Sequence, residues 1–369
     1  VGAVYPAYGP NHGFRGTVAA SPGERRVCVT ASNVGPGAHT NFGCRTVAAT
    51  SGDPFGNYES ARGVPGGVEV KGWTIDPDTT APIYVWVTVD GVGRHLYANK
   101  SRPDVAAVYP AYGPSHGFRA SLAAEPGTYG VCVTASNVGA GAHKSLGCRT
   151  VVVGEIPEAL LGTDWERIPT TDDVVALTFD AGASDAGVPS ILATLAEKGV
   201  RATFFPTGDF ARAHPARVAA IVAAGHRLGS HSDTHVRYPT LTNEEIAEDL
   251  ARAEAAIVAA ANGPGAKPLF RFPYGDRTQP DILAVNDAGY VPIRWTVDTL
   301  GWQGTSGGIT AEIVLQRVLD TATPGQIVLM HVGAHPTDGS TLDADALPQI
   351  IDELRARGYS FVTLDTLFD

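Results

Sequence analysis

Two histidines four residues apart, His231 and His235, have the spacing of a metal-binding pair. If the residues after Ser230 form a helix, the two imidazoles lie on one face about one turn apart and can hold a single ion. Residues 223–230 have the pattern of a helix end, a glycine stop and a short strand, so the pair follows the C-terminal end of a strand. Chemistry collects at that end in α/β folds. Taken alone, such a pair is more often two hydrogen-bonded surface histidines.

Polar or ionisable residues also follow the other apolar runs of the C-terminal half. One acid or histidine after a strand usually caps a helix or lies in a surface loop. Five such endings in one domain predict a shared site instead, with two metal-binding imidazoles, a carboxylate base and a further imidazole. The endings are Asp180, the pair His231 and His235, the segment from Arg271 to Tyr274, Asp298, and His331.

Strand and helix patterns alternate from residue 174 to the end, as the elements that position these residues. Repeated units of this kind predict a parallel sheet, closed as a barrel, with the reactive residues on one rim. Thr242 and Glu245 form a capping box at the start of the longest helix. The expected strands are 174–179, 202–205, 269–272, 291–295, 327–330 and 361–364. The expected helices are 188–198, 215–224, 242–261, 279–288, 311–322 and 346–357.

Five motifs in this region resemble those of the polysaccharide deacetylases of carbohydrate esterase family four, the NodB-homology group. The resemblance covers roughly residues 164–369. It implies a distorted (β/α) barrel with fewer than eight full units and a divalent metal at its mouth, usually zinc, for which cobalt or nickel can substitute. The motifs are Thr178-Phe179-Asp180-Ala181-Gly182, His231-Ser232-Asp233-Thr234-His235, Arg271-Phe272-Pro273-Tyr274, Asp298-Thr299-Leu300-Gly301-Trp302 and Leu329-Met330-His331.

The resemblance also implies roles for these residues. His231 and His235 would bind the metal, Asp180 would take a proton from the attacking water, and His331 would protonate the departing nitrogen, which is the help that a resonance-stabilised amide needs. The remaining roles would be positional. Arg271 would orient Asp180, and Asp298 would raise the pKa of His331. The Tyr274 backbone N–H would hold the oxyanion together with the metal. Trp302 and Leu329 would form the walls of the slot for the acetyl methyl group. For Trp302 and Leu329, core packing is an equally good interpretation.

The sequence departs from the family pattern directly after the proposed base. The family commonly has a second Asp there as the third metal ligand, whereas this chain has Ala181, whose methyl group cannot coordinate a metal. Asp180 itself, the nearby Asp185 or water molecules are the alternatives that would complete the shell. Asp185 is explained equally well as the N-cap of the next helix. Gly301 is a second departure, because an acid often precedes the Trp of that motif.

The N-terminal part of the chain contains a repeat. Residues 4–10 recur as residues 108–114, and Cys28 and Cys44 recur at the same shift as Cys132 and Cys148. Two cysteines per copy and none later predict one disulfide in each copy, Cys28–Cys44 and Cys132–Cys148, and therefore a protein that is secreted or associated with the cell wall. His12 and His39 recur as His116 and His143, which fits hydrogen bonding within the fold better than catalysis.

Short alternating runs at 68–73, 83–89, 117–122, 130–134 and 148–153 predict a small β-sandwich. The array resembles duplicated β-sandwich modules that precede wall-active enzymes in secreted bacterial proteins, and cell wall or glycan is one expectation for their ligand. The first copy lacks counterparts of several strands, so we expect the native chain to continue upstream. The predicted organisation is a partial repeat at 1–50, a linker at 51–66, a complete repeat at 67–153, a linker at 154–172 and a deacetylase domain at 173–369.

The composition of the chain argues against several classes of binding partner. The formal net charge of −11 argues against nucleic acid or anionic lipid as the main ligand, and no apolar run approaches the roughly 18 residues of a membrane span. The sequence therefore predicts a secreted metal-dependent hydrolase that removes acetyl groups from N-acetylhexosamine polymers, peptidoglycan first and chitin second. Two alternatives stay open: an O-esterase acting on acetylxylan, and a wall- or glycan-binding protein that has lost catalysis.

Overall fold

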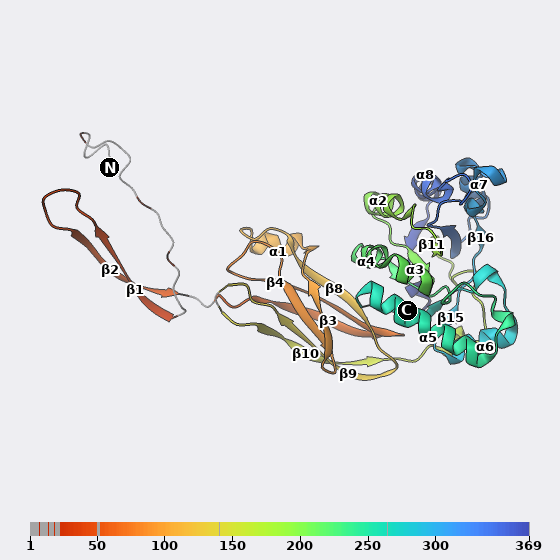
Figure 1. Ribbon diagram of the computed structural model, residues 1–369, viewed down its shortest axis with the longest axis horizontal. Helices are drawn as coiled ribbons and strands as arrows, with labels where there is room; N and C mark the ends of the chain where they lie inside the picture. Colours follow the sequence, from red (N-terminus) through yellow and green to blue (C-terminus); the bar gives the residue numbers. More distant parts are fainter. Residues whose placement is uncertain are drawn as a thin grey trace.

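The computed structural model of the chain describes residues 7, 14, 18, 23–49, 52–139, 141–263 and 265–368. Along the chain these residues form a β-hairpin, an all-β region and a region of alternating strands and helices, coloured from red through yellow and green to blue in Figure 1. None of the helices in the described ranges is long and apolar enough to cross a membrane.

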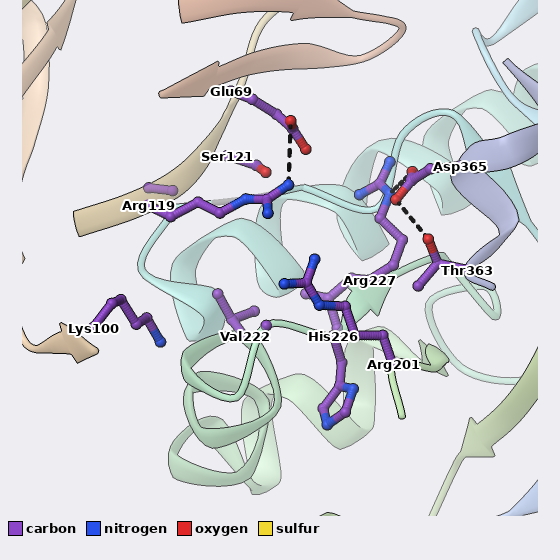
Figure 2. A pocket seen from close by; sticks show the side chains of 13 residues that line it. Glu69, Lys100, Arg119, Ser121, Arg201, Val222, His226, Arg227, Thr363 and Asp365 are labelled. Atoms are coloured by element: carbon purple, nitrogen blue, oxygen red, sulfur yellow. Dashed lines mark hydrogen bonds and ion pairs between the residues drawn. The ribbon is translucent and has the colours of Figure 1, made fainter. Parts of the chain in front are cut away.

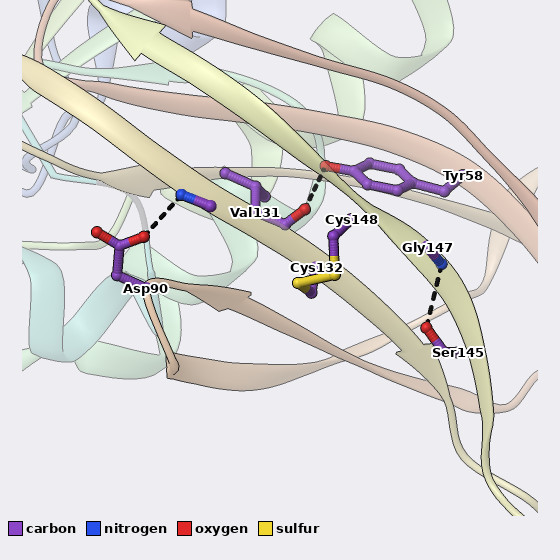
Figure 3. Close-up of a disulfide and its surroundings, with 8 residues drawn as sticks. Tyr58, Asp90, Val131, Cys132, Ser145, Gly147 and Cys148 are labelled. Atoms are coloured by element: carbon purple, nitrogen blue, oxygen red, sulfur yellow. Dashed lines mark hydrogen bonds between the residues drawn. A yellow bond between two sulfur atoms is a disulfide. The ribbon is translucent and has the colours of Figure 1, made fainter.

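The two disulfides of the described residues join directly paired cysteines of β-hairpins. Cys28 lies opposite Cys44 in the first hairpin, with Cα atoms 4.0 Å apart. Cys132 lies opposite Cys148 in the second hairpin (Figure 3), and their Cα atoms are also 4.0 Å apart. The predicted pairing of the four cysteines is therefore confirmed. The hairpin strands are β1 Gly23–Ala31 with β2 Thr40–Ala49, and β9 Gly127–Ala135 with β10 Lys144–Val153.

The all-β region consists of two antiparallel four-stranded sheets within the described residues. Valines that alternate along β4, β5 and β9 are buried in one core between these sheets, because successive side chains of a strand point to opposite faces. One sheet has the order β3 Phe55–Val64, β4 Gly67–Ile75, β8 Ser115–Ala123 and β7 Lys100–Ser101. The other has the order β10, β9, β5 Tyr84–Val89 and β6 Val92–Tyr97, and a short helix, α1 Pro103–Val108, completes the region.

Strand β3 corrects the predicted linker at 51–66. Its sequence mixes glycine, asparagine, serine and arginine with few apolar residues, so it lacks the alternation that marks a strand. Pairing with β4 holds it in the sheet, and the buried Tyr58 donates a hydrogen bond from Oη to the carbonyl oxygen of Val131 at 3.4 Å. The predicted linker at 154–172 is also packed, because Trp165 N and Ile168 N donate to carbonyl oxygens of Pro292 and Gly325.

The two hairpins differ in their neighbours. Strand β9 pairs with β5 as well as β10, and Val131 is fully buried, whereas the equivalent Val27 of β1 is 44% exposed and β1 pairs only with β2 in the described part of the chain. Tyr8 and His12 of the repeated segment lie outside the described residues. The recurring histidines His39 and His143 both accept a hydrogen bond at Nδ1 from a backbone N–H at 2.9 Å, in keeping with a structural role.

The C-terminal region contains the predicted parallel sheet. Among the described residues the strand order is β13 Arg227–Leu228, β12 Thr203–Pro206, β11 Val174–Ala181, β17 Gln326–His331 and β16 Val297–Asp298, with β18 Ser360–Val362 also pairing β11. A separate parallel pair joins β14 Leu269–Phe270 to β15 Val291–Pro292. Parallel β/α order is confirmed, but the pairing of the described strands does not close a ring.

Helices flank this sheet close to the predicted positions (Figure 1). The capping box of α5 is present, with reciprocal hydrogen bonds between Thr242 and Glu245. The sequence did not predict α3, and it placed the start of α8 four residues too late. The helices are α2 Val188–Lys198, α3 Gly208–Ala213, α4 Pro215–Ala223, α5 Asn243–Ala261, α6 Gln279–Asp287, α7 Ala311–Asp320 and α8 Leu342–Ala356.

The register of the central strands places two chemical groups side by side. Phe179 and Ala181 of β11 belong to the core between sheet and helices. Asp180, between them in sequence, points to the other face because side chains alternate along a strand. Asp180 is the register partner of His331 on the neighbouring β17, so both side chains lie at the C-terminal end of the sheet.

Candidate active site

A cavity of about 510 Å³ lies at the C-terminal ends of β11 and β17. Four predicted polar residues and one predicted wall residue line it together, so the convergence expected from the strand ends is present in the structure. Leu329 and Asp185 do not line it. The lining residues are Asp180, Gly182, Ala183, Ser184, His231, His235, Trp302, His331, Gly333, Ala334, His335 and Pro336.

Asp180 is fixed by Arg271, which is fully buried. The guanidinium Nη1 donates to Asp180 Oδ1 at 2.7 Å, while Nε and Nη2 donate to the carbonyl oxygens of Ile293 and Arg294. Burial raises the pKa of Asp180, but the charge of Arg271, followed by His231 and His331, outweighs it, and the net pKa is lowered. Asp180 is therefore an oriented carboxylate with Oδ2 directed to the histidines.

The surroundings of the paired histidines favour their neutral forms. His231 Nδ1 lies 2.9 Å from the carbonyl oxygen of Arg271, which can only accept, so Nδ1 carries the proton and Nε2 presents its lone pair. His235 Nε2 lies 3.1 Å from His231 Nε2. Burial lowers the pKa of His231 despite the nearby Asp180, and burial together with His231 lowers the pKa of His235 to about 4.

The segment that carries this pair is a loop and not the expected helical turn. Ser232 and His235 adopt left-handed backbone conformations, with φ of 69° and 61°. His235 N donates to Ser232 Oγ at 2.8 Å, and Asp233 N donates to the buried carboxylate of Asp249 in α5. Local hydrogen bonds and one helix therefore bring the imidazoles together, and spacing along the sequence alone misidentified the conformation.

Two imidazoles and one carboxylate lie close together in the cavity. Asp180 Oδ2 lies 3.3 Å from His231 Nε2, and since both atoms are acceptors when His231 is neutral, the contact favours a cation or a proton beside them. Imidazoles and carboxylates are donor types that suit a divalent ion such as zinc. No group of three or more His, Cys, Asp or Glu side chains in the described ranges, however, is arranged to hold a metal ion.

Neither Ala181, at the family's usual ligand position, nor Asp185 supplies a third ligand beside the imidazole pair. Ala181 is fully buried in the core on the helix side of β11. Asp185 binds Arg217 through a 2.7 Å contact to Nε, and its Oδ2 lies 3.8 Å from His214 Nδ1. Asp185 is also not the N-cap of α2, because Gly187 occupies that position. The geometry leaves Asp180 as the carboxylate beside the pair.

His331 also lines the cavity, and it has a carboxylate neighbour that the sequence did not predict. Asp343 Oδ2 accepts from the His331 backbone N–H at 2.7 Å and lies 3.6 Å from Nδ1, an ion-pair contact beyond hydrogen-bond distance. Burial lowers the pKa of His331, but the carboxylates of Asp343, Asp180 and, last, Asp298 outweigh it, and the net pKa is raised. His331 is therefore suited to carry a proton.

Asp298 raises the pKa of His331, as predicted, but its effect comes after those of Asp343 and Asp180. Its carboxylate also accepts from Leu300 N at 2.9 Å and from Trp302 Nε1 at 3.3 Å, so it organises the loop that holds Trp302. Little in the sequence distinguished Asp343, because an acidic residue in the first turn of α8 is in itself a favourable helix start.

The predicted wall residues separate in the structure. Trp302 is half exposed, with its ring 6.5 Å from the His331 ring, whereas Leu329 is 3% exposed and does not line the cavity. Tyr274 has a φ of 60° and stacks edge-on against His235 with ring centres 4.4 Å apart. Left-handed backbone at Tyr274 and at Leu300, close to the candidate groups, is the kind of strain that accumulates at functional sites.

His335 is a cavity residue that the sequence motifs did not include. Its Nδ1 lies 3.3 Å from Asp338 Oδ2 and 3.4 Å from Ser306 Oγ, which ties together two loops at the rim. Asp338 also accepts from Ser306 N at 2.6 Å. Such loop contacts depend on tertiary structure and leave no periodic signal in the sequence.

Comparison with known proteins gives consistent matches in this region. Residues 167–293 match the family described as Polysaccharide deacetylase. The chain is 33% identical to the peptidoglycan-N-acetylglucosamine deacetylase of Bacillus cereus over 197 residues, 53% of this chain and 68% of that protein. It is 33% identical to a peptidoglycan-N-acetylglucosamine deacetylase of Listeria monocytogenes, of which the match spans 42%. It is 29% identical to the chitooligosaccharide deacetylase of Azorhizobium caulinodans, of which the match spans 96%.

Among solved structures, a mutant pseudoenzyme of carbohydrate esterase family four, with restored enzymatic activity, matches with 30% identity and a TM-score of 0.52. That match covers 60% of this chain and 77% of the other. The wild-type pseudoenzyme, from Bacillus anthracis, gives the same TM-score at 28% identity and covers 75% of that chain. The family match, the identity over two thirds of the Bacillus cereus protein and the shared fold agree, and the chain therefore belongs to the polysaccharide deacetylase family.

Proposed function

We propose that the chain is a secreted, metal-dependent deacetylase that removes acetyl groups from polymers of N-acetylhexosamine, with peptidoglycan as the first substrate and chitin as the second. The observation that carries the proposal is that one cavity is lined by Asp180, whose pKa is lowered, by an imidazole pair whose pKa values are lowered, and by His331, whose pKa is raised. The named activities of the Bacillus, Listeria and Azorhizobium relatives support the substrate class.

Asp180 and His331 divide the proton transfers in this proposal. Asp180 accepts a proton from the water that attacks the acetyl carbonyl carbon, and its lowered pKa keeps it ionised for that step. His331 then donates a proton to the nitrogen as the C–N bond breaks, so that acetate and a free amine leave. Asp180 and His331 are register partners on β11 and β17, which supports their acting on the same acetyl group.

His231 and His235 are the proposed metal ligands, with zinc first and cobalt or nickel as substitutes. The Nδ1 contact of His231 with the Arg271 carbonyl fixes the tautomer whose Nε2 can bind the ion. Asp180 Oδ2 or water completes the shell in place of the ligand that Ala181 lacks. When bound, the ion would acidify a water molecule and polarise the acyl carbonyl.

The remaining groups position the reaction. Arg271 holds Asp180 through its 2.7 Å hydrogen bond and is itself held by two carbonyl oxygens, so Asp180 cannot turn away from the cavity. We propose the Tyr274 backbone N–H as an oxyanion donor and the exposed Trp302 as a wall for the acetyl group. Leu329 would support that wall from the core.

The proposal is tested by acetate release from a glycan panel of peptidoglycan, chitin oligomers and acetylxylan. We expect release from the first two by the full chain with zinc, cobalt or nickel supplied, and loss of release after chelation. Faster release from acetylxylan than from both N-acetylated glycans would assign the chain to O-deacetylation. Acetate release that is unchanged by thorough metal removal would contradict the metal part.

Ala181 favours a second candidate function. A chain without the family's second acid can be a glycan-binding protein that has lost catalysis, and the matching Bacillus anthracis structure belongs to a pseudoenzyme. Retained binding to peptidoglycan, with no acetate released from any glycan under any metal, would favour this candidate.

The location and the N-terminal region complete the proposal. The two disulfides fit an oxidising compartment and hence secretion or cell-wall association. We propose cell wall or glycan as the ligand of the all-β region. Sedimentation of the full chain with insoluble peptidoglycan or chitin tests this, with a chain lacking residues 1–153 as the comparison.

A further inference from the structure

A second cavity, of about 120 Å³, lies between the all-β region and the parallel β/α region (Figure 2). On one side it is lined from β4, β7 and β8, and on the other by the residues that precede β12 and begin β13. These are the N-terminal ends of the parallel strands, whereas Asp180 and His331 lie at the C-terminal ends. The cavity is therefore separate from the candidate active site.

Cations outnumber anions among the lining side chains. Two acids face four basic side chains, although the whole chain has a formal net charge of −11. Both acids already have partners within the described residues: Asp365 Oδ1 lies 2.8 Å from Arg227 Nε, and Glu69 Oε2 lies 2.9 Å from Arg62 Nε and 3.6 Å from Arg119 Nη2. The four cations are Lys100, Arg119, Arg201 and Arg227.

Two of the cations have no carboxylate partner in the described part of the chain. Lys100 donates to the carbonyl oxygen of Ala223, and Arg201 extends into the cavity as an exposed side chain (Figure 2). Arg201 acts on its neighbours electrostatically. Burial, followed by the charge of Arg201, lowers the pKa of Lys100, and the same two causes lower the pKa of His226 to about 4. An anion bound in the cavity would offset the charge of these two cations.

The size of the cavity and its hydrogen-bond donors determine which anion would suit it. Small-molecule sites usually have volumes of about 300–1,000 Å³, whereas about 120 Å³ is room for roughly four water molecules at about 30 Å³ each. The small volume favours a compact oxyanion over a larger ligand such as a sugar ring. Arginine presents several N–H donors in a fork that matches phosphate oxygens, and the hydroxyl of Ser121 is a further donor on the cavity wall.

We propose that this cavity is a binding site for a phosphate group, held by Arg201 and Lys100 with Arg119 and Ser121 from the all-β region. The phosphate is free inorganic phosphate or a phosphodiester of an anionic polymer, since both present the same oxygens. Because the lining comes from both regions, the bound group joins the all-β region to the β/α region at the face opposite the candidate active site.

Isothermal titration of the full chain with sodium phosphate, against sodium chloride of equal ionic strength, tests the proposal. The variants are Arg201→Gln and the control Arg45→Gln, an exposed arginine of the first hairpin. We expect saturable binding of one phosphate by the wild type and by Arg45→Gln, and binding at least about tenfold weaker in Arg201→Gln, which corresponds to 1.4 kcal/mol. Arg201 is exposed, so we expect its variant to keep the wild-type thermal unfolding temperature without phosphate.

Equal binding by all three proteins, or no saturable binding up to about 10 mM phosphate, would overturn the proposal. A second arm with soluble poly(glycerol phosphate) separates the two sources. Tighter binding of the polymer, lost in Arg201→Gln, assigns the site to a polymer, and equal binding per phosphate assigns it to the free ion. Acetate release should be unchanged in Arg201→Gln, because the cavity is at the other end of the sheet.

Discussion

The two sides of the candidate active site contain histidines near the C-terminal ends of strands, and the pKa values of these histidines are shifted in opposite directions. His231 is 5% exposed and faces a backbone carbonyl at Nδ1, and its pKa is lowered. His331 is 27% exposed and faces the carboxylate of Asp343, and its pKa is raised. A neutral carbonyl fixes a tautomer, whereas a carboxylate stabilises the charged imidazole.

Asp180 lies between the two sides and makes the difference instructive. Its charge raises the pKa of both His231 and His331. At His231 burial outweighs that effect, and at His331 the second carboxylate, Asp343, tips the balance the other way. Beside one shared acid, the pKa is therefore lowered at His231 and raised at His331, because the remaining neighbours differ.

Removing the imidazole of His331 should give the largest effect on the rate of acetate release. We expect His331→Ala to lower kcat for acetate release at least about 100-fold, since a positioned general acid contributes about 10²–10⁴-fold. Bound metal, measured by elemental analysis, should stay at the wild-type level because His331 is not a proposed ligand. His335→Ala is the matched control, another histidine of the same cavity, and should retain activity within about threefold. An unchanged rate for His331→Ala would remove it from the mechanism.

Removing the imidazole of His231 should lower activity by weakening the binding of the proposed metal ion. We expect His231→Ala to weaken zinc binding at least about tenfold, because one of the two imidazoles is lost, and second-shell changes alone can cost about 10–100-fold. Activity should recover partly at high zinc concentration, which His331→Ala should not do. Competition with a chromogenic chelator measures the affinity. Wild-type zinc affinity in His231→Ala would show that the ion, if bound, lies elsewhere.

Much of the site could be predicted because the ends of strands can be predicted from the sequence. The strands around Asp180 and His331 are continuous apolar runs, and their parallel order follows from the helices between them, so convergence of these two residues could be derived from the sequence. The helix α2 was predicted at its observed bounds, Val188–Lys198, for the same reason. Family motifs supplied the candidate roles.

The parts that could not be predicted depend on contacts between distant residues. Asp343 is twelve residues beyond His331, and only the docking of α8 brings its carboxylate to the His331 backbone N–H and to Thr299 Oγ1. The loop that carries His231 is likewise set by Asp249, in α5, and not by helical spacing. Strand β3 has little apolar alternation because its place in the sheet is decided by pairing with β4.

Asp343→Asn should reduce the contrast between the two sides without removing either histidine. The amide keeps an acceptor for the His331 N–H but lacks the charge, so the pKa of His331 should fall. Activity at pH above neutral should then drop roughly three- to tenfold, and the alkaline limb of the kcat profile should move to lower pH.

Stability gives an independent readout of the same change. A raised pKa in the folded state means that protonated His331 stabilises the fold below the ordinary histidine pKa, and that this contribution is lost as the pH rises through the raised value. Denaturant unfolding across that range should show a weaker pH dependence in Asp343→Asn than in the wild type. Identical pH profiles for both proteins would mean that Asp343 does not set the charge of His331.

Asp298→Asn should have the smallest effect. It tests whether Asp298 or Asp343 has the larger influence on the pKa of His331. Asp298 contributes to the raised pKa of His331 only after Asp343 and Asp180, and its carboxylate is engaged by Leu300 N and Trp302 Nε1. We therefore expect less than about a threefold change in kcat, with an alkaline limb close to that of the wild type and a larger change in KM through Trp302. A shift of the alkaline limb larger than that of Asp343→Asn would restore Asp298 as the partner of His331, because the carboxylate that controls the proton donor must show the stronger effect on its titration.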